Sequence, residues 1–168
     1  MSISDVQAVI DSAKIRGTDS LERLIRERLR EATEAEVRDA TELALEIIES
    51  VPLFLARAGQ EAEERQLTSV VTPLLNHAEG YFVQPVDLIP EMTQGLAGLL
   101  DDSYLVLRIL QNLDRGPDRF LDWDLGHPLE FLRRLVGEKV AGKLDALSLD
   151  AMHEIAYDVD RLGDETAH

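Results

Sequence analysis

Cysteine is absent from this 168-residue chain, which excludes disulfides, thiolate catalysis and cysteine-based metal sites. Several catalytic signatures are absent too, because the chain contains no nucleophile elbow, no phosphate-binding loop and no dinucleotide fingerprint. The segment HEIAY at 153–157 has Tyr157 where the zinc-protease signature requires its second histidine. These absences favour a binding protein over an enzyme, and we expect no resident cofactor.

Positive charge is scarce in the chain. There are 17 Lys and Arg residues against 33 Asp and Glu residues, so the formal net charge is -16. Nucleic-acid backbones and anionic membrane surfaces are both bound through clustered Lys and Arg. We therefore expect neither of them as a partner. A basic protein, a divalent cation or a simple gain in solubility would each fit this charge.

The sequence also shows no pattern typical of a targeting segment or of a membrane-spanning segment. The N-terminus carries Asp5 and lacks the basic region and the uninterrupted apolar stretch of a signal peptide, so we expect a cytoplasmic protein. The most apolar segment, 96–113, is interrupted by Asp101, Asp102 and Arg108. Because charges are costly at mid-bilayer depth, this segment predicts a buried helix rather than a membrane span.

Alternation with period two is absent, and apolar residues recur at steps of three and four along most of the chain. The pattern predicts an all-α fold, a single compact bundle of about seven helices, and the length favours one domain. We divide this domain into N-terminal helices, a central motif, a loop, C-terminal helices and a tail expected to fray: 1–79, 80–115, 116–127, 128–163 and 164–168.

Local residues predict where several helices begin and end. Thr33 has capping-box spacing to Glu36, so a helix should begin there. Pro52 should kink or end that helix, and the acid-rich turn after Gln60 favours a new helix N-terminus. Pro73 either occupies the first position of a further helix or bends a continuous one.

The loop at 116–127 contains the only tryptophan of the chain and alternating charges, with glycine and proline at its ends. Trp123 either folds back on the core or forms a binding hot spot, and its neighbours Asp124 and His127 are further candidates for contact with a partner. After the loop, Pro128 is suited to the start of one helix, and Ser148 or Asp150 to the start of another.

The central stretch 81–113 is apolar but broken by prolines and glycines. Its two prolines predict a rigid turn. The run Asp101-Asp102-Ser103 can cap a helix, and the residues that follow, 104–113, are apolar on nearly every side. We therefore expect a buried central helix near residues 103–113.

A recognisable motif lies in this stretch: an aromatic pair, then P-x-DLIP, then a Gly-x-x-Asp-Asp segment that leads into an apolar helix. The residues that carry it are Tyr81-Phe82, Pro85, Asp87-Leu88-Ile89-Pro90 and Gly98-Leu99-Leu100-Asp101-Asp102. The motif resembles the YkvA-like family of domains of unknown function, and it differs from that pattern at Glu91, at Gln94 and in the spacer before Gly98. The resemblance implies a small helical fold and brings no assigned biochemical role.

The motif is unusual because no Lys or Arg occurs between Arg65 and Arg108. Buried acids without local bases need backbone N–H groups, a distant Arg, a metal or another molecule as partners. Three explanations are therefore open: helix caps and turns, a divalent-cation site with oxygen ligands, or an acidic surface for a basic partner. The candidate metal ligands are Asp87, Glu91, Asp101 and Asp102.

The histidines of the chain give weaker evidence for a metal site than these carboxylates do. Asp124 with His127, and Asp150 with His153, have the i, i+3 spacing of carboxylate and His ligands in helical-bundle metal sites. An acid-rich chain produces such pairs by chance, and the first pair falls in the loop. His77, close before Gly80, is expected at a helix C-terminus rather than as a base.

Our leading hypothesis is a helical module that acts by binding another protein, through residues 114–128 and an acidic face near Asp101. The alternative is a divalent-metal-dependent hydrolase of a phosphorylated small molecule that uses the four candidate carboxylates. A third hypothesis is a nucleic-acid mimic, in which spaced carboxylates imitate phosphates.

Overall fold

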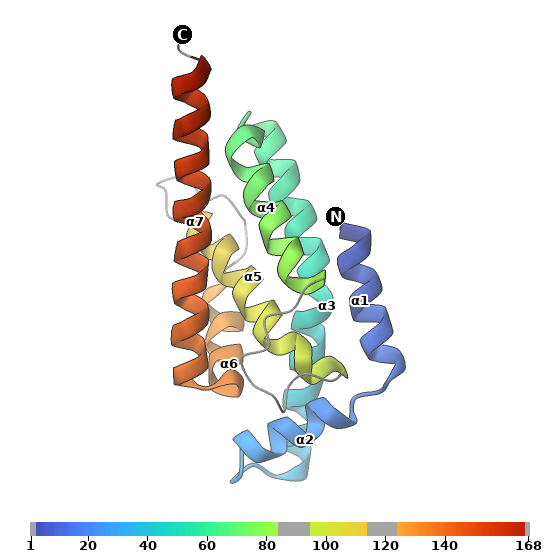
Figure 1. Ribbon diagram of the computed structural model, residues 1–168. Helices are drawn as coiled ribbons and strands as arrows, with labels where there is room; N and C mark the ends of the chain where they lie inside the picture. The colour runs from blue at the N-terminus through green and yellow to red at the C-terminus, as the bar shows by residue number, and fades with distance from the viewer. Residues whose placement is uncertain (1–2, 84–94, 114–123, 167–168) are drawn as a thin grey trace.

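The computed structural model describes the backbone of residues 3–83, 95–113 and 124–166, and their side chains except those of 83 and 154–166. This part of the chain contains seven α-helices, a short 3-10 helix and no β-strand, so the all-α prediction is confirmed (Figure 1). The helices are α1 (Ile3–Ile15), α2 (Asp19–Arg28), α3 (Glu34–Glu64), α4 (Thr68–Val83), η2 (Gly95–Gly98), α5 (Leu99–Leu113), α6 (Gly126–Val136) and α7 (Glu138–Thr166). None of these described helices is long and apolar enough to cross a membrane.

The central helix of the bundle is α5. It contacts α3, α4, α6, α7 and η2, and it crosses the molecule between α7 and the α3–α4 pair (Figure 1). Every residue from Leu99 to Leu107 is buried, as expected for a helix that other helices enclose. The predicted buried helix is therefore confirmed. It begins at Leu99, four residues before the predicted start, because η2 leads directly into it.

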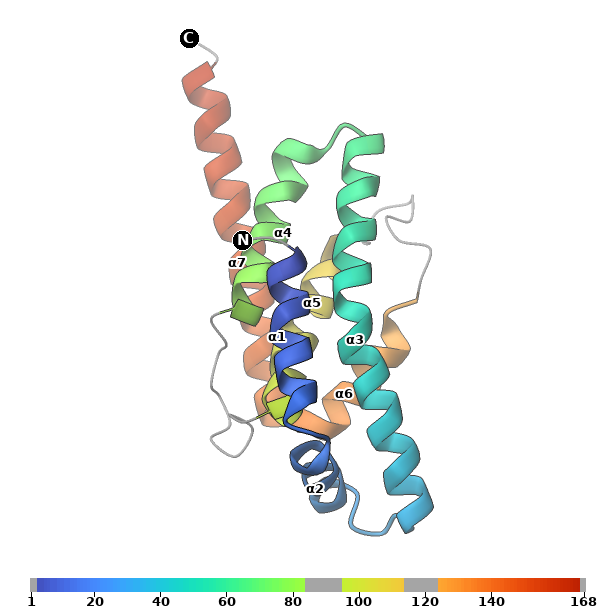
Figure 2. The ribbon, with the colours of Figure 1, turned by 90° about the vertical axis from the view of Figure 1, so that its right-hand side faces the viewer.

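The N-terminal helix α1 lies against both α3 and α4 (Figure 2). Its buried side chains are Val6, Ile10 and Ala13, which repeat at helical spacing. At its C-terminal end, the Lys14 ammonium lies 2.7 Å from a carboxylate oxygen of Glu49 on α3. α1 therefore packs across α3 and α4 on one side of the bundle.

The start of α3 is fixed by a capping box, as the sequence predicts. The Thr33 hydroxyl accepts a hydrogen bond from the backbone N–H of Glu36 at 3.2 Å, and the Glu36 carboxylate accepts one from the backbone N–H of Thr33 at 3.4 Å. Two of the backbone donors that a helix N-terminus leaves without partners are satisfied in this way.

The course of α3 after its midpoint differs from the prediction. The helix continues through Pro52 and past Gln60 to Glu64, so Pro52 does not end it and the expected new N-terminus after Gln60 is wrong. The alternative, a kink at Pro52, stays a prediction. A proline inside a helix removes one backbone hydrogen bond and costs roughly 3 kcal/mol. The buried stripe on both sides of the proline offsets this cost, since it packs into the core on one continuous helix face: Ala44, Ile48, Val51, Leu55 and Ala58.

A tight reversal joins α3 to α4. Gln66 adopts a left-handed conformation with φ of 58°. The backbone N–H of Leu67 donates to the carbonyl of Ala62 at 2.8 Å, and that of Gln66 donates to the carbonyl of Glu63 at 3.2 Å. This is the Schellman pattern, with glutamine at the position that glycine usually takes. It brings α4 back along α3, with Pro73 inside one continuous helix.

The last two helices meet at Gly137, whose φ is 90°. We predicted that the second of them would begin at Ser148 or Asp150, and this is wrong, since α7 starts at Glu138 and passes through both residues. A side chain at position 137 would be strained at this φ, so glycine permits the reversal. Across the turn, Arg133 on α6 lies 2.8 Å from a carboxylate oxygen of Glu138 on α7.

Candidate functional site

Two of the four candidate metal ligands lie in the first turn of α5. Asp101 and Asp102 are 3% and 1% exposed, and the backbone N–H of Asp102 donates to the Asp101 Oδ1 at 2.9 Å. Negative side chains are favoured at a helix N-terminus, where the helix dipole is positive. Because both residues are buried, they do not form the exposed acidic face that we expected near Asp101.

The other two candidate ligands, Asp87 and Glu91, lie outside the described residues. Among the side chains that the structure describes, no three His, Asp or Glu residues are grouped so that they could hold a metal ion. Next to the two aspartates, the buried Ser103 hydroxyl has no hydrogen-bond partner in the described part of the chain. The four-carboxylate site therefore stays a prediction.

The interaction candidates Asp124 and His127 are exposed at the start of α6, while Trp123 lies outside the described residues. The Asp124 Oδ1 accepts a hydrogen bond from the backbone N–H of Gly126 at 2.8 Å, which closes an Asx-turn. The other Asp124 oxygen is 3.8 Å from the His127 Nε2. These contacts account for Asp124 as part of a helix start, and they leave its role in partner binding a prediction.

A polar network that the sequence analysis did not identify joins α5, α6 and α7. The Tyr104 hydroxyl donates to Asp145 at 2.8 Å and accepts from Arg133 at 2.9 Å. Arg133 and Arg108 also donate to Asp145, at 2.9 and 3.2 Å. Arg108 further donates to Gln111 at 2.8 Å and to Asn112 at 3.0 Å.

This network alters the titration of its members. Burial raises the pKa of Tyr104 to about 12, and the hydrogen bond to Asp145 adds to the increase. Burial works to raise the pKa of Asp145, but its bonds to Arg133 and Tyr104 outweigh burial and lower that pKa. Tyr104 is thus a neutral donor and Asp145 an ionised acceptor at neutral pH. With each charge satisfied by a partner, the network acts as a clamp between helices.

The helix α4 places a second set of polar groups near the crevice under α1. His77 lies inside α4 rather than at its C-terminus, so that expectation is wrong, and its Nε2 is 3.2 Å from the Tyr81 hydroxyl. Glu79 is buried, at 6% exposed, and its Oε2 has no hydrogen-bond partner among the described residues. Burial raises the pKa of Glu79; the positive amino terminus opposes this increase, and Asp5 adds to it.

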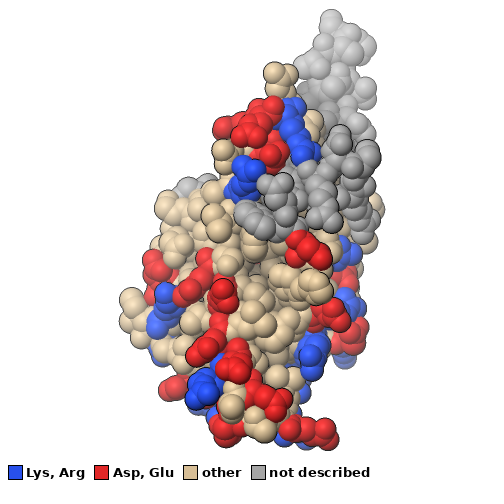
Figure 3. Space-filling view, turned by 180° about the vertical axis from the view of Figure 1, so that it is seen from behind, with Lys and Arg blue, Asp and Glu red and all other residues tan. Residues whose placement is uncertain are grey.

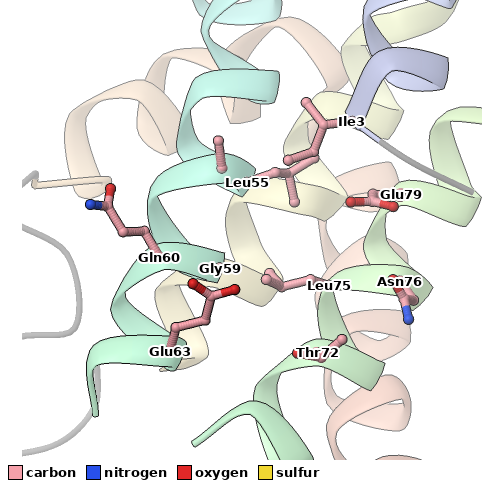
Figure 4. A pocket seen from close by; sticks show the side chains of 10 residues that line it. Ile3, Leu55, Gly59, Gln60, Glu63, Thr72, Leu75, Asn76 and Glu79 are labelled. Carbon is pink, nitrogen blue, oxygen red and sulfur yellow. The ribbon is translucent and has the colours of Figure 1, made fainter. Parts of the chain in front are cut away.

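Glu79 lines a groove of about 370 Å³ between α3 and α4. One wall is the i, i+3, i+4, i+7 face of α3: Ala56, Gly59, Gln60 and Glu63. The other wall is the same kind of face of α4: Thr72, Leu75, Asn76 and Glu79. Ile3 of α1 and Leu55 of α3 lie at the end that holds Glu79, and Glu63 and Thr72 lie at the opposite end (Figure 4). Each wall corresponds to about 10 Å along a helix axis.

Gly59 leaves space in the wall that α3 contributes to the groove. A Cβ atom added to Gly59 would lie 3.6 Å from Leu75 Cδ1, so a larger side chain there would extend into the space between the helices. The lining residues include two acids and no Lys, Arg or His. On the same helix, by contrast, the Glu61 carboxylate lies 3.1 Å from Arg65 and 3.7 Å from Arg57. The groove is therefore an acidic, partly apolar cavity between two helices.

The sequence contained one indication of this groove that we did not use. Glu79 lies four residues after Leu75 and next to Ala78, within the apolar stripe of α4, and inside the stretch without Lys or Arg between Arg65 and Arg108. A carboxylate in an apolar stripe with no local base is a candidate for burial without a partner. Its position beneath α1 could not be inferred, because this depends on the packing of three helices.

The comparisons with known proteins give one match. No curated protein and no solved structure matches the chain. A family profile described as "Protein of unknown function (DUF1232)" matches residues 78–107. The match begins at the end of α4, includes Glu79, and extends into the buried part of α5 with Asp101 and Asp102. The chain therefore contains a segment similar to a family of unknown function, over the stretch that holds its buried acids.

Proposed function

We propose that this protein is a helical module that binds a basic segment of another protein. The observation that carries the proposal is the outward face of α3. Asp39, Glu42 and Glu46 are exposed there, at spacings of three, four and seven residues, and have no ion pair with any described residue. Leu43 and Leu53 are also exposed on this helix, at 42% and 61%.

The acids that border this face form ion pairs, unlike the acids on the face itself. Glu34 at the start of α3 lies 2.9 Å from Arg26 of α2, and Glu49 pairs with Lys14 of α1. Arg38 is the only Lys or Arg between residues 34 and 56. In the view from behind, acidic side chains prevail over basic ones across the lower part of the surface, beside a broad uncharged area (Figure 3). Such a combination suits a partner with Lys or Arg beside apolar side chains.

A matched pair of variants tests this proposal. The variant Asp39→Asn/Glu42→Gln/Glu46→Gln removes three charges from the proposed surface. The variant Glu27→Gln/Glu130→Gln/Asp150→Asn removes three charges from exposed residues elsewhere, so both proteins have the same net charge. Tagged protein is used to capture a partner, which mass spectrometry identifies, and the affinity of the purified pair is then measured.

The expected result is a stoichiometric partner whose affinity falls more than tenfold in the first variant, and little in the second. The affinity should also decrease as salt increases, since exposed charges are screened. A clean protein without partner, or an equal loss in both variants, would contradict the proposal.

The finer family assignment and the location are part of the same proposal. The match at residues 78–107 is compatible with the YkvA-like name, since it includes the Tyr81-Phe82 pair and the Gly98 to Asp102 segment. A cytoplasmic location is kept as part of the proposal. The metal-dependent hydrolase and the nucleic-acid mimic stay alternative hypotheses, and no described contact favours either of them.

A further inference from the structure

The groove around Glu79 is separate from the surface proposed for protein binding. It lies along the C-terminal half of α3, between residues 56 and 63, whereas the exposed acids Asp39, Glu42 and Glu46 lie in the N-terminal half. Its second wall and its closed end come from α4 and α1. Any ligand of this groove is therefore a second binding activity of the protein.

The lining side chains do not neutralise the carboxylate at the buried end of the groove, and the positive amino terminus offsets its burial only in part, since the pKa of Glu79 stays raised. The Glu79 side chain is 94% buried, its Oε2 receives no hydrogen bond from the described residues, and the carboxylate is directed into the space beside Ile3 and Leu55 (Figure 4). Removing a carboxylate from water without a hydrogen-bond donor costs free energy, which a cationic donor in the groove would offset. Among the described side chains, no Lys, Arg or His lines the groove to act as that donor.

The arrangement of the two acids selects the kind of cation. Magnesium and calcium are held by carboxylates that converge on one point, with waters completing six or more oxygen ligands. Glu63 and Glu79 instead lie at opposite ends of a groove about 10 Å long, with Gly59 and Leu75 between them. An ammonium group needs only a few acceptors on one side and is carried on an apolar chain. An alkyl chain would pack along Leu75 in the partly apolar middle, and an ammonium at each end would meet one carboxylate.

We propose that the groove between α3 and α4 binds a linear alkyl diamine, with one ammonium at the buried Glu79 carboxylate and the other at Glu63. The amide side chains of Gln60 and Asn76 line the same groove and offer further acceptors. The buried contact at Glu79 provides most of the affinity, because the exposed Glu63 contact is screened by water and salt.

Isothermal titration calorimetry of the full chain at 150 mM salt tests this, with three probes of equal chain length: 1,7-diaminoheptane, heptylamine and 1,7-heptanediol. We expect the diamine to bind best, the monoamine more weakly and the diol not at all. Glu79→Gln should weaken diamine binding at least tenfold. Glu63→Gln should remove the advantage of the diamine over the monoamine. The matched control is Glu64→Gln, an exposed neighbour that does not line the groove, and it should bind as the wild type does.

Nuclear magnetic resonance of the wild-type protein gives an independent readout that needs no variant. On addition of diamine, the side-chain amide signals of Gln60 and Asn76 should shift, and those of Gln111 and Asn112, which do not line the groove, should not. Absence of diamine binding, equal binding of the diol, equal binding by Glu79→Gln and wild type, or shifts at Gln60 and Asn76 no larger than those at Gln111 and Asn112 would each overturn the proposal. Glu79→Gln folding is verified by circular dichroism.

Discussion

The Tyr104 hydroxyl on α5 donates a hydrogen bond to the Oδ1 of Asp145 on α7, at 2.8 Å, across 41 positions of sequence. Asp145 also accepts from Arg108 and Arg133, so one carboxylate connects side chains of three helices. The central helix is thus held both by apolar packing and by a charged clamp at one side.

The clamp predicts a large effect for Asp145→Ala. Its removal leaves two arginines and a buried tyrosine hydroxyl without their shared acceptor, and hydrogen bonds to charged groups contribute about 1.5–3 kcal/mol. Because Asp145 is a quarter exposed, we expect a loss of about 2 kcal/mol in the free energy of unfolding, measured by urea denaturation. Asp150→Ala on the exposed side of the same helix should change it by less than about 0.5 kcal/mol.

The same carboxylate predicts an acid dependence. The pKa of Asp145 is lowered in the folded state, so its stabilising contribution is present above the unfolded-state value of about 3.9 and is lost as pH falls through the folded-state value. The difference in unfolding free energy between wild type and Asp145→Asn should therefore be largest near pH 7 and should shrink below pH 4. If this difference in unfolding free energy stayed constant down to pH 2, the lowered pKa of Asp145 would not be the source of the stabilisation.

Glu79 predicts the opposite dependence. Burial raises its folded-state pKa, with Asp5 adding to the increase and the amino terminus opposing it, so ionised Glu79 destabilises the fold. Below the unfolded-state value of about 4.3 the group is protonated in both states and this penalty is absent. Glu79→Gln should therefore raise the melting temperature at pH 7 and have little effect near pH 4. If Glu79→Gln raised the melting temperature equally at pH 7 and pH 4, burial of the Glu79 charge would not be the cause of the increase.

The turn between α3 and α4 predicts a stabilising substitution. Gln66 has φ of 58°, a conformation that costs a residue with a side chain about 1–2 kcal/mol and glycine almost nothing. Gln66→Gly also increases the freedom of the unfolded chain, which offsets part of the gain. We expect a net increase of about 0.5–1 kcal/mol in the free energy of unfolding. Arg65→Gly, one position earlier at a negative φ, should lower it instead.

Asp102→Asn tests the role of the acids in α5. Asp102 lies buried in the first turn, where its charge interacts favourably with the helix dipole, so its loss should cost roughly 1 kcal/mol. Stabilisation of the metal-free protein would instead indicate repulsion among acids in a cation site. Thermal melts in chelator and in magnesium, calcium or manganese, together with elemental analysis, complete the test.

The sequence predicted well what depends on neighbouring residues. The Thr33 capping box involves positions three apart, and the apolar stripe of α3 repeats every three or four positions, so both are visible without a fold. The buried helix near 103–113 was predictable for the same reason, since a helix apolar on all sides has no face suited to water. The resemblance in residues 81–113 likewise overlaps the family match at 78–107.

What depends on distant packing was not predictable. Pro52 does not end α3 because the core on both sides holds the helix together, and no residue near the proline reveals this. The partners of Asp145 lie 12 to 41 positions away in sequence. The base-free stretch showed that Glu79 would lack a local partner, but only the packing of α1, α3 and α4 decided that it would be buried at the end of a groove. Helical periodicity assigns a residue to a face, and the tertiary structure determines what covers that face.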